Sequence, residues 1–186
     1  NLAGATAVPG LTDSHAHLML EAARRRKADL SNCTDVCACL ETLERWGAAH
    51  PLQPWVQGFG FDQTTWPGGR WPTRKDLDVI RRPVRADHIS GHAVWVNSAA
   101  LRAANITRAT KSPQGGTIVR DALGRPTGIL TDNAMALIDR VVPPPRASAV
   151  DASFSGNPGG VRRGRAYDGA RFGGITGRRR LLLGPR

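Results

Sequence analysis

Two histidines, His15 and His17, stand two positions apart directly after a short apolar run near the start of the chain. In a strand, the side chains of residues i and i+2 point to the same face, so both imidazoles can face one ion. Imidazole nitrogen is a common ligand of zinc and of similar divalent metals. The spacing therefore predicts a strand that ends in a pair of metal ligands, although H-x-H pairs also occur in proteins that bind no metal.

Strand-like and helix-like patterns alternate along the next 120 or so residues, which is typical of an α/β architecture. We expect Thr34 and Asn97 to begin helices as N-caps, and Asn105 to take the left-handed conformation just after a helix. The predicted helices cover residues 18–30, 34–46, 73–82, 97–104 and 132–142. The predicted strands cover residues 55–61 and 84–89 and a hairpin within 117–130, centred on L-G-R-P.

The stretch P-G-L-T-D-S-H-A-H-L around the two histidines resembles the signature of the amidohydrolase superfamily, which consists of metal-dependent hydrolases built on a (β/α)₈ barrel. Four later stretches resemble one branch, the amidohydrolase family 3 related to N-substituted formamide deformylases. In chain order they are Gly58–Trp66, Pro72–Asp78, Ser90–Leu101 and Gly124–Asp132. The resemblance covers about residues 3–145.

This resemblance implies that residues 1–146 form part of a (β/α)₈ TIM-type barrel, with the first strands and a hairpin insertion. It also implies hydrolysis of a carbon–nitrogen bond in a small non-peptide amide or formamide by metal-activated water. The cofactor would be a divalent metal, zinc in our interpretation, held by His15 and His17. The catalytic general base of the family is expected outside this chain.

Four further residues are candidates for the site, each with a structural alternative. Asp132 is either a metal-bridging carboxylate or a helix N-terminal carboxylate that the macrodipole favours. His92 either contacts substrate or lies near the metal, or else is held by structural hydrogen bonds. Trp66 and Trp95 either line an apolar substrate pocket or pack in the core.

The chain is short for such a barrel, since a (β/α)₈ domain usually takes ~250 residues. The resemblance ends near residue 146, and no histidine follows His92 in the sequence. We therefore expect a shortened barrel that shows no hydrolase activity by itself.

Residues 147–186 form a tail rich in Gly and Arg. Its last 36 residues hold nine glycines and a net charge of +6, more than half of the +11 of the whole chain. We expect this tail to be disordered or translated out of frame. The alternative is a non-catalytic basic protein that binds nucleic acid through the Arg/Gly tail.

The hydropathy pattern and the cysteines bear on the cellular location of the protein rather than on its function. The chain has no apolar run long enough for a transmembrane helix and no secretory signal pattern, so we expect a cytoplasmic protein without a membrane partner. Cys33, Cys37 and Cys39 fit no common disulfide or zinc-finger spacing, and we expect small half-buried residues on one helix. The sequence leaves the oligomeric state open.

Overall fold

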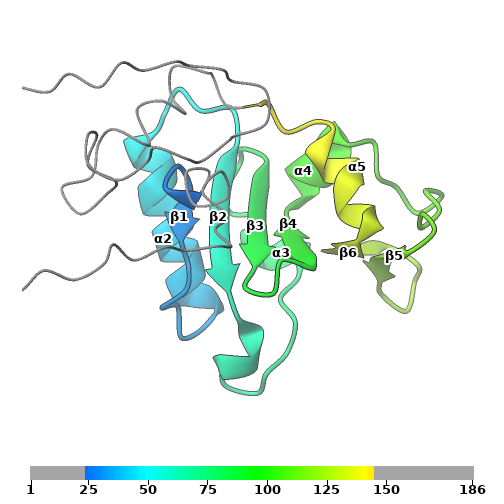
Figure 1. The fold of residues 1–186 in the computed structure, drawn as a ribbon, viewed down its shortest axis with the longest axis horizontal. Helices are drawn as coiled ribbons and strands as arrows, with labels where there is room; N and C mark the ends of the chain where they lie inside the picture. The colour runs from blue at the N-terminus through cyan, green and yellow to red at the C-terminus, as the bar shows by residue number, and fades with distance from the viewer. Residues whose placement is uncertain (1–23, 145–186) are drawn as a thin grey trace, which may run out of the picture.

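Six strands and the helices around them make up the part of the chain that the computed structural model describes, residues 24–144 (Figure 1). The strands are β1 (Ala28–Asp29), β2 (Val56–Phe61), β3 (Val84–His88), β4 (Ala93–Val96), β5 (Gly116–Arg120) and β6 (Pro126–Asp132). The α-helices are α2 (Val36–Ala49), α3 (Arg74–Leu77), α4 (Ser98–Ala103) and α5 (Ala136–Asp139). Two 3₁₀ turns, η1 (Gln63–Thr65) and η2 (Asn133–Met135), complete the set. His15, His17 and the Gly/Arg-rich tail lie outside the described residues.

The six strands form one mixed sheet in the order β1-β2-β3-β4-β6-β5. Strands β1, β2 and β3 are parallel, whereas β4, β6 and β5 pair antiparallel to their neighbours. Because β4 is antiparallel to β3 and β6 is antiparallel to β4, β6 runs in the same direction as β3. The last residues of β2, β3 and β6 (Phe61, His88 and Asp132) and the first residue of β4 (Ala93) therefore share one edge of the sheet, which we call the carboxyl edge. The opposite, amino edge holds Val56, Val84, Val96 and Pro126.

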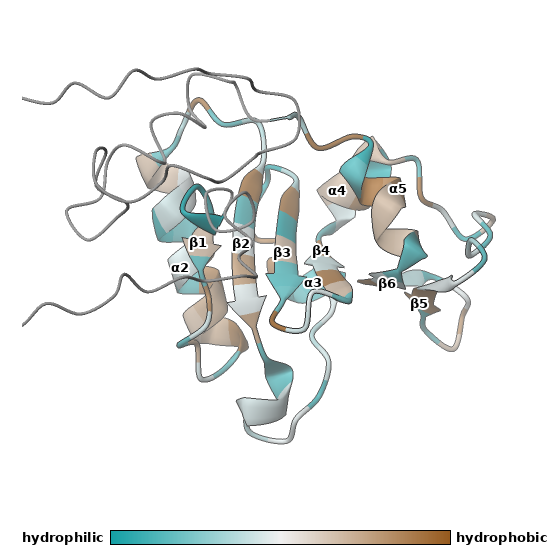
Figure 2. Cartoon of the chain, in the orientation of Figure 1, coloured by the Kyte–Doolittle hydropathy of each residue, from teal (hydrophilic) through white to brown (hydrophobic). Residues whose placement is uncertain are grey.

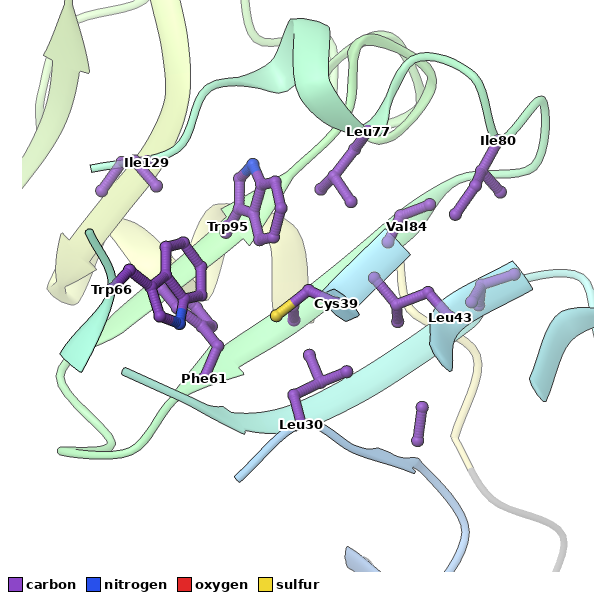
Figure 3. Packing of buried hydrophobic residues seen from close by; sticks show 13 residues of the cluster. Leu30, Cys39, Leu43, Phe61, Trp66, Leu77, Ile80, Val84, Trp95 and Ile129 are labelled. Atoms are coloured by element: carbon purple, nitrogen blue, oxygen red, sulfur yellow. The ribbon is translucent and has the colours of Figure 1, made fainter. Parts of the chain in front are cut away.

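One face of the sheet is covered by α2 and α3 (Figure 3). Helix α2 buries Cys39 and Leu43 against β2, because residues four apart lie on one side of a helix. Gly58 of β2 allows this close approach, since a Cβ there would lie 3.0 Å from the Leu43 Cδ2 atom. The start of β2 and β3 is strongly hydrophobic in Figure 2, as expected for strands beneath a helix.

Helices α4 and α5 cover the other face. Strand β4 is buried on both sides. Its Trp95 packs in the hydrophobic cluster under α2 and α3, which we call the first core cluster. Val94 and Val96 pack in the cluster under α4 and α5, the second core cluster. Ile129 and Leu130 of β6 divide in the same way. The central strands thus hold the two layers together.

Several local predictions are confirmed. The strand at 55–61, the hairpin between β5 and β6, and the helix after Asn97 are present. The Asn97 side chain caps α4 by accepting a hydrogen bond from the Ala100 N–H at 2.9 Å, and Asn105 has a φ of +52°.

Other predictions are wrong. Ala28 and Asp29 do not continue a helix from residue 18 but pair with Gly58 and Phe59 of β2, so strand pairing overrides the local helical pattern. The N-cap of α2 is Asp35 rather than Thr34, and its carboxylate accepts from the Ala38 N–H at 2.8 Å.

Two further differences concern an entire strand and an entire helix. Strand β4 was not predicted, and the expected helix at 132–142 is divided between the end of β6, the turn η2 and one turn of α5. Within residues 24–144 the sheet is mixed and open rather than a complete barrel. No helix in this part of the chain is long and apolar enough to cross a membrane.

Candidate functional site

The carboxyl edge collects polar side chains from the ends of two strands and from one connection between strands. His88 ends β3, Asp132 ends β6, and Ser90 and His92 lie in the short connection between β3 and β4. In barrels and in open α/β sheets, ligand sites lie at the carboxyl ends of the strands. This edge is therefore where a functional site is expected.

His92 and Asp132 form a pair across 40 residues of sequence. The His92 Nδ1 and Asp132 Oδ1 atoms are 3.0 Å apart, and the Asp132 N–H donates to the His92 carbonyl oxygen at 3.0 Å. Because a carboxylate only accepts, Nδ1 carries the proton of the neutral ring, and Nε2 then keeps its lone pair. The pair is open to solvent, with the side chains 78% and 51% exposed.

The backbone of Asp132 is strained. Its φ of +49° and ψ of −126° lie in a region that non-glycine residues rarely adopt. Its side chain makes no capping hydrogen bond to the following turn η2. The strained backbone instead aims the carboxylate at His92.

His88 lies under two aromatic rings. Its ring centroid is 5.1 Å from that of Phe61 and 5.3 Å from that of Trp71. Nδ1 lies 2.8 Å from the Ser90 Oγ and accepts from the Ser90 N–H at 3.1 Å. Nε2 is buried and has no hydrogen-bond partner among residues 24–144. Burial lowers the pKa of His88, and the attraction of Asp62 opposes this shift in part.

Trp66 and Trp95 lie in the first core cluster together with Phe61 (Figure 3). Trp95 is fully buried and Trp66 is 5% exposed. The Trp95 indole N–H donates to the Thr73 carbonyl oxygen at 2.8 Å, and the Trp66 indole N–H donates to the Cys33 carbonyl oxygen at 2.9 Å. Both rings contact Phe61, which in turn contacts His88. Their contact with the site is therefore through Phe61.

The other carboxylates near this edge already have partners. Asp87 pairs with Lys27 at 2.5 Å and with Arg85 at 2.9 Å. Hydrogen bonds from the Thr64 side chain and backbone lower the pKa of Asp62. Within residues 24–144 no group of three or more His, Cys, Asp or Glu side chains is placed to hold a metal ion.

The three cysteines are free thiols in the part of the chain that the structure describes. Cys37 and Cys39 lie on α2, but Cys33 precedes it, so the prediction of one shared helix is wrong for Cys33. Burial, and then the neighbouring Cys33, raises the pKa of the Cys39 thiol. A buried neutral thiol of this kind is inert.

Sequence reasoning missed His88, Ser90 and Trp71. A signal was present in the H-x-S-x-H spacing of His88, Ser90 and His92, which repeats the i, i+2 pattern of His15 and His17. Trp71 carried no signal, since its position over His88 depends on the loop after η1.

A model of the amidohydrolase family matches residues 1–155 of the chain. The protein YtcJ of Bacillus subtilis (strain 168), named as a candidate amidohydrolase, is 39% identical over 157 residues, which are 83% of this chain and 30% of YtcJ. The N-substituted formamide deformylase of Arthrobacter pascens is 36% identical over 142 residues, which are 74% of this chain and 26% of the relative.

A solved structure shares the fold. The crystal structure of an uncharacterized metal-dependent hydrolase from Pyrococcus furiosus superimposes with a TM-score of 0.54 at 26% identity. The match covers 78% of this chain and 28% of that one. The chain thus spans less than a third of the length of these three relatives.

Proposed function

Because this chain belongs to the amidohydrolase family, we propose that it supplies the N-terminal part of a metal-dependent hydrolase that cleaves the carbon–nitrogen bond of a small non-peptide amide or formamide. The relatives support this proposal, since one is named as a deformylase of N-substituted formamides and another as a metal-dependent hydrolase. A cytoplasmic location and a lack of activity in the isolated chain stay predictions.

The observation that carries the proposal is the His92–Asp132 pair at the carboxyl edge. Asp132 holds the ring of His92 in the tautomer whose Nε2 lone pair is free. A histidine oriented by a carboxylate is the usual arrangement of an imidazole that binds metal. The backbone strain at Asp132 also favours function, because such strain gathers at active sites.

The residue types fit a zinc ion. We propose His15 and His17 as ligands, with His92 or the second carboxylate oxygen of Asp132 as a further ligand from the carboxyl edge. Imidazole nitrogen and carboxylate oxygen are both zinc ligands. When bound, a divalent ion supplies an activated water and polarises the carbonyl group of the substrate.

The remaining candidates act through packing. Trp66 and Trp95 support Phe61, and Phe61 together with Trp71 surrounds His88. We propose that these rings form the apolar wall beside the reacting amide.

Zinc titration of the full 186-residue chain by calorimetry tests the proposal. We expect His15→Ala, His17→Ala and His92→Ala each to weaken zinc binding, and Asp132→Asn to weaken it by about 10–100-fold, as for other groups that orient a ligand. His50→Ala is the matched control, because His50 follows α2 toward the amino edge and its Nδ1 contacts the Trp46 carbonyl oxygen. Equal zinc affinity in all five variants would contradict the proposal.

A further inference from the structure

The hydrogen bonds of Ser90 determine which nitrogen of His88 carries its proton. A backbone N–H only donates, so the 3.1 Å contact from the Ser90 N–H requires a lone pair on the His88 Nδ1. The Ser90 hydroxyl, 2.8 Å away, can donate to the same atom. The Ser90 Oγ itself accepts from the His92 N–H at 3.2 Å. In the neutral ring the proton is therefore on Nε2.

The Nε2–H group of His88 is then a buried donor without an acceptor. An unsatisfied buried donor destabilises the folded state, so native proteins keep few of them. A small rotation of the His88 ring does not bring Nε2–H to an acceptor, because Ser90 holds the ring on one side and Phe61 and Trp71 pack around it. The donor is positioned for a partner that is not part of residues 24–144.

His92 has the opposite tautomer. Its Nδ1–H donates to Asp132, which leaves the lone pair on Nε2. The connection between β3 and β4 thus presents one histidine that donates and one that accepts, four residues apart. A metal ion takes the lone pair of an imidazole, so it suits His92 and does not suit His88 as Ser90 holds it.

We propose that His88 binds the carbonyl oxygen of the amide substrate through its Nε2–H, as a neutral hydrogen-bond donor beside the metal site. This inference rests on the proposed function, because the substrate class comes from it. A neutral carbonyl oxygen is the acceptor that fits, since no charge on His88 is needed to hold it. As negative charge develops on that oxygen during attack by water, the same hydrogen bond strengthens.

The surroundings keep His88 neutral. Burial lowers its pKa, and the charged group identified beside it is Asp62, whose carboxylate is occupied by hydrogen bonds from Thr64. Of the two rings on His88, Phe61 is fully buried, whereas Trp71 is 43% exposed. A ligand oxygen therefore approaches from the side of Trp71, whose loop contains Gly68 and Gly69 at positive φ.

The first test is the tautomer of His88 in the ¹⁵N-labelled full chain, read from long-range ¹H–¹⁵N spectra at pH 7.5 and assigned with His88→Phe. We expect a protonated Nε2 and an unprotonated Nδ1 for His88. A protonated Nδ1, or an imidazolium ring, would overturn the proposal. This readout needs no metal and no activity.

The second test uses N-methylformamide as the probe and the Trp71 indole N–H signal as the reporter. We expect saturable binding that His88→Phe weakens by roughly 10-fold, as for the loss of one neutral hydrogen bond. His88→Gln keeps an N–H donor and should stay within about threefold of the wild type. Equal binding by His88→Phe, or no saturable binding by the wild type, would overturn the proposal.

The two proposals fail separately. If zinc binding is absent while the Nε2–H tautomer and the probe binding hold, the metal-dependent reaction is wrong and the amide site stands. If zinc binds as expected while His88→Phe leaves probe binding unchanged, the inference on His88 alone is wrong.

Discussion

The two edges of the sheet both carry polar side chains, but they use them differently. At the amino edge, Asn97 is 1% exposed, and every hydrogen-bonding direction of its amide is occupied. Its oxygen accepts from the N–H groups of Val84 and Ala100, and its nitrogen donates to the carbonyl oxygens of Ile80 and Arg82. At the carboxyl edge, the Nε2 atom of His88 is buried and finds no acceptor in the described part of the chain.

The same contrast applies to backbone strain. Asn105, which follows α4, and Asp132 at the carboxyl edge both have a positive φ. Asn105 lies in the left-handed region that asparagine tolerates, whereas the ψ of Asp132 takes it to a conformation suited to glycine. In these two comparisons, the satisfied and unstrained residues stabilise the fold, while His88 and Asp132 lie where a ligand is expected.

The largest effect is expected at the amino edge. Asn97→Ala removes the cap of α4 and leaves the buried Val84 N–H without a partner, so we expect a loss of about 3 kcal/mol in the free energy of unfolding. Denaturant titration measures it. Asn133→Ala is the control, because Asn133 is exposed and donates one hydrogen bond to the Gln114 carbonyl oxygen. A loss at Asn97 no larger than that at Asn133 would remove the contrast between the edges.

A smaller effect of opposite sign is expected at the carboxyl edge. Asp132→Gly relieves the backbone strain, and we expect it to stabilise the fold by about 1 kcal/mol. Asn105→Gly should change stability by less than about half of that, since asparagine tolerates the left-handed conformation that Asn105 has. Thermal unfolding of both variants checks the pair. Destabilisation by Asp132→Gly would mean that this residue is not held in strain.

The smallest effect concerns pH. Burial lowers the pKa of His88 in the folded state, whereas the unfolded chain has the ordinary histidine value near ~6.5. Below that value the unfolded state binds more protons, so stability is present above it and declines as the pH falls. We expect the free energy of unfolding of the wild type to decline between about pH 7 and pH 5 more steeply than that of His88→Phe. Parallel pH profiles of the two proteins would show that His88 is not buried in the neutral form.

Elements whose signals are local could be predicted from the sequence. Gly124, with a φ of +74°, and its neighbours specify the hairpin turn, and Asn97 specifies the start of α4 by its own side chain. Strands β1 and β4 could not be predicted, because two residues of β1 depend on pairing with β2, and β4 is apolar on both faces and has no alternation to detect.

The candidate site likewise has one part that the sequence predicts and one part that it does not. His92 and Asp132 are recognisable as candidates from their motifs, but their pairing joins residues 40 positions apart. His88 was missed, since its significance lies in what surrounds it: a half-buried ring between Phe61 and Trp71 whose Nε2 has no partner within residues 24–144.

By itself, the sequence determined the family and the local turns and caps, because these depend on residue types at short spacing. Only the tertiary structure decided that β6 returns parallel to β3, that Asp132 reaches His92, and that His88 and His92 present opposite tautomers. Strand pairing and burial act between residues far apart in the chain, and they set which atoms are left free to bind.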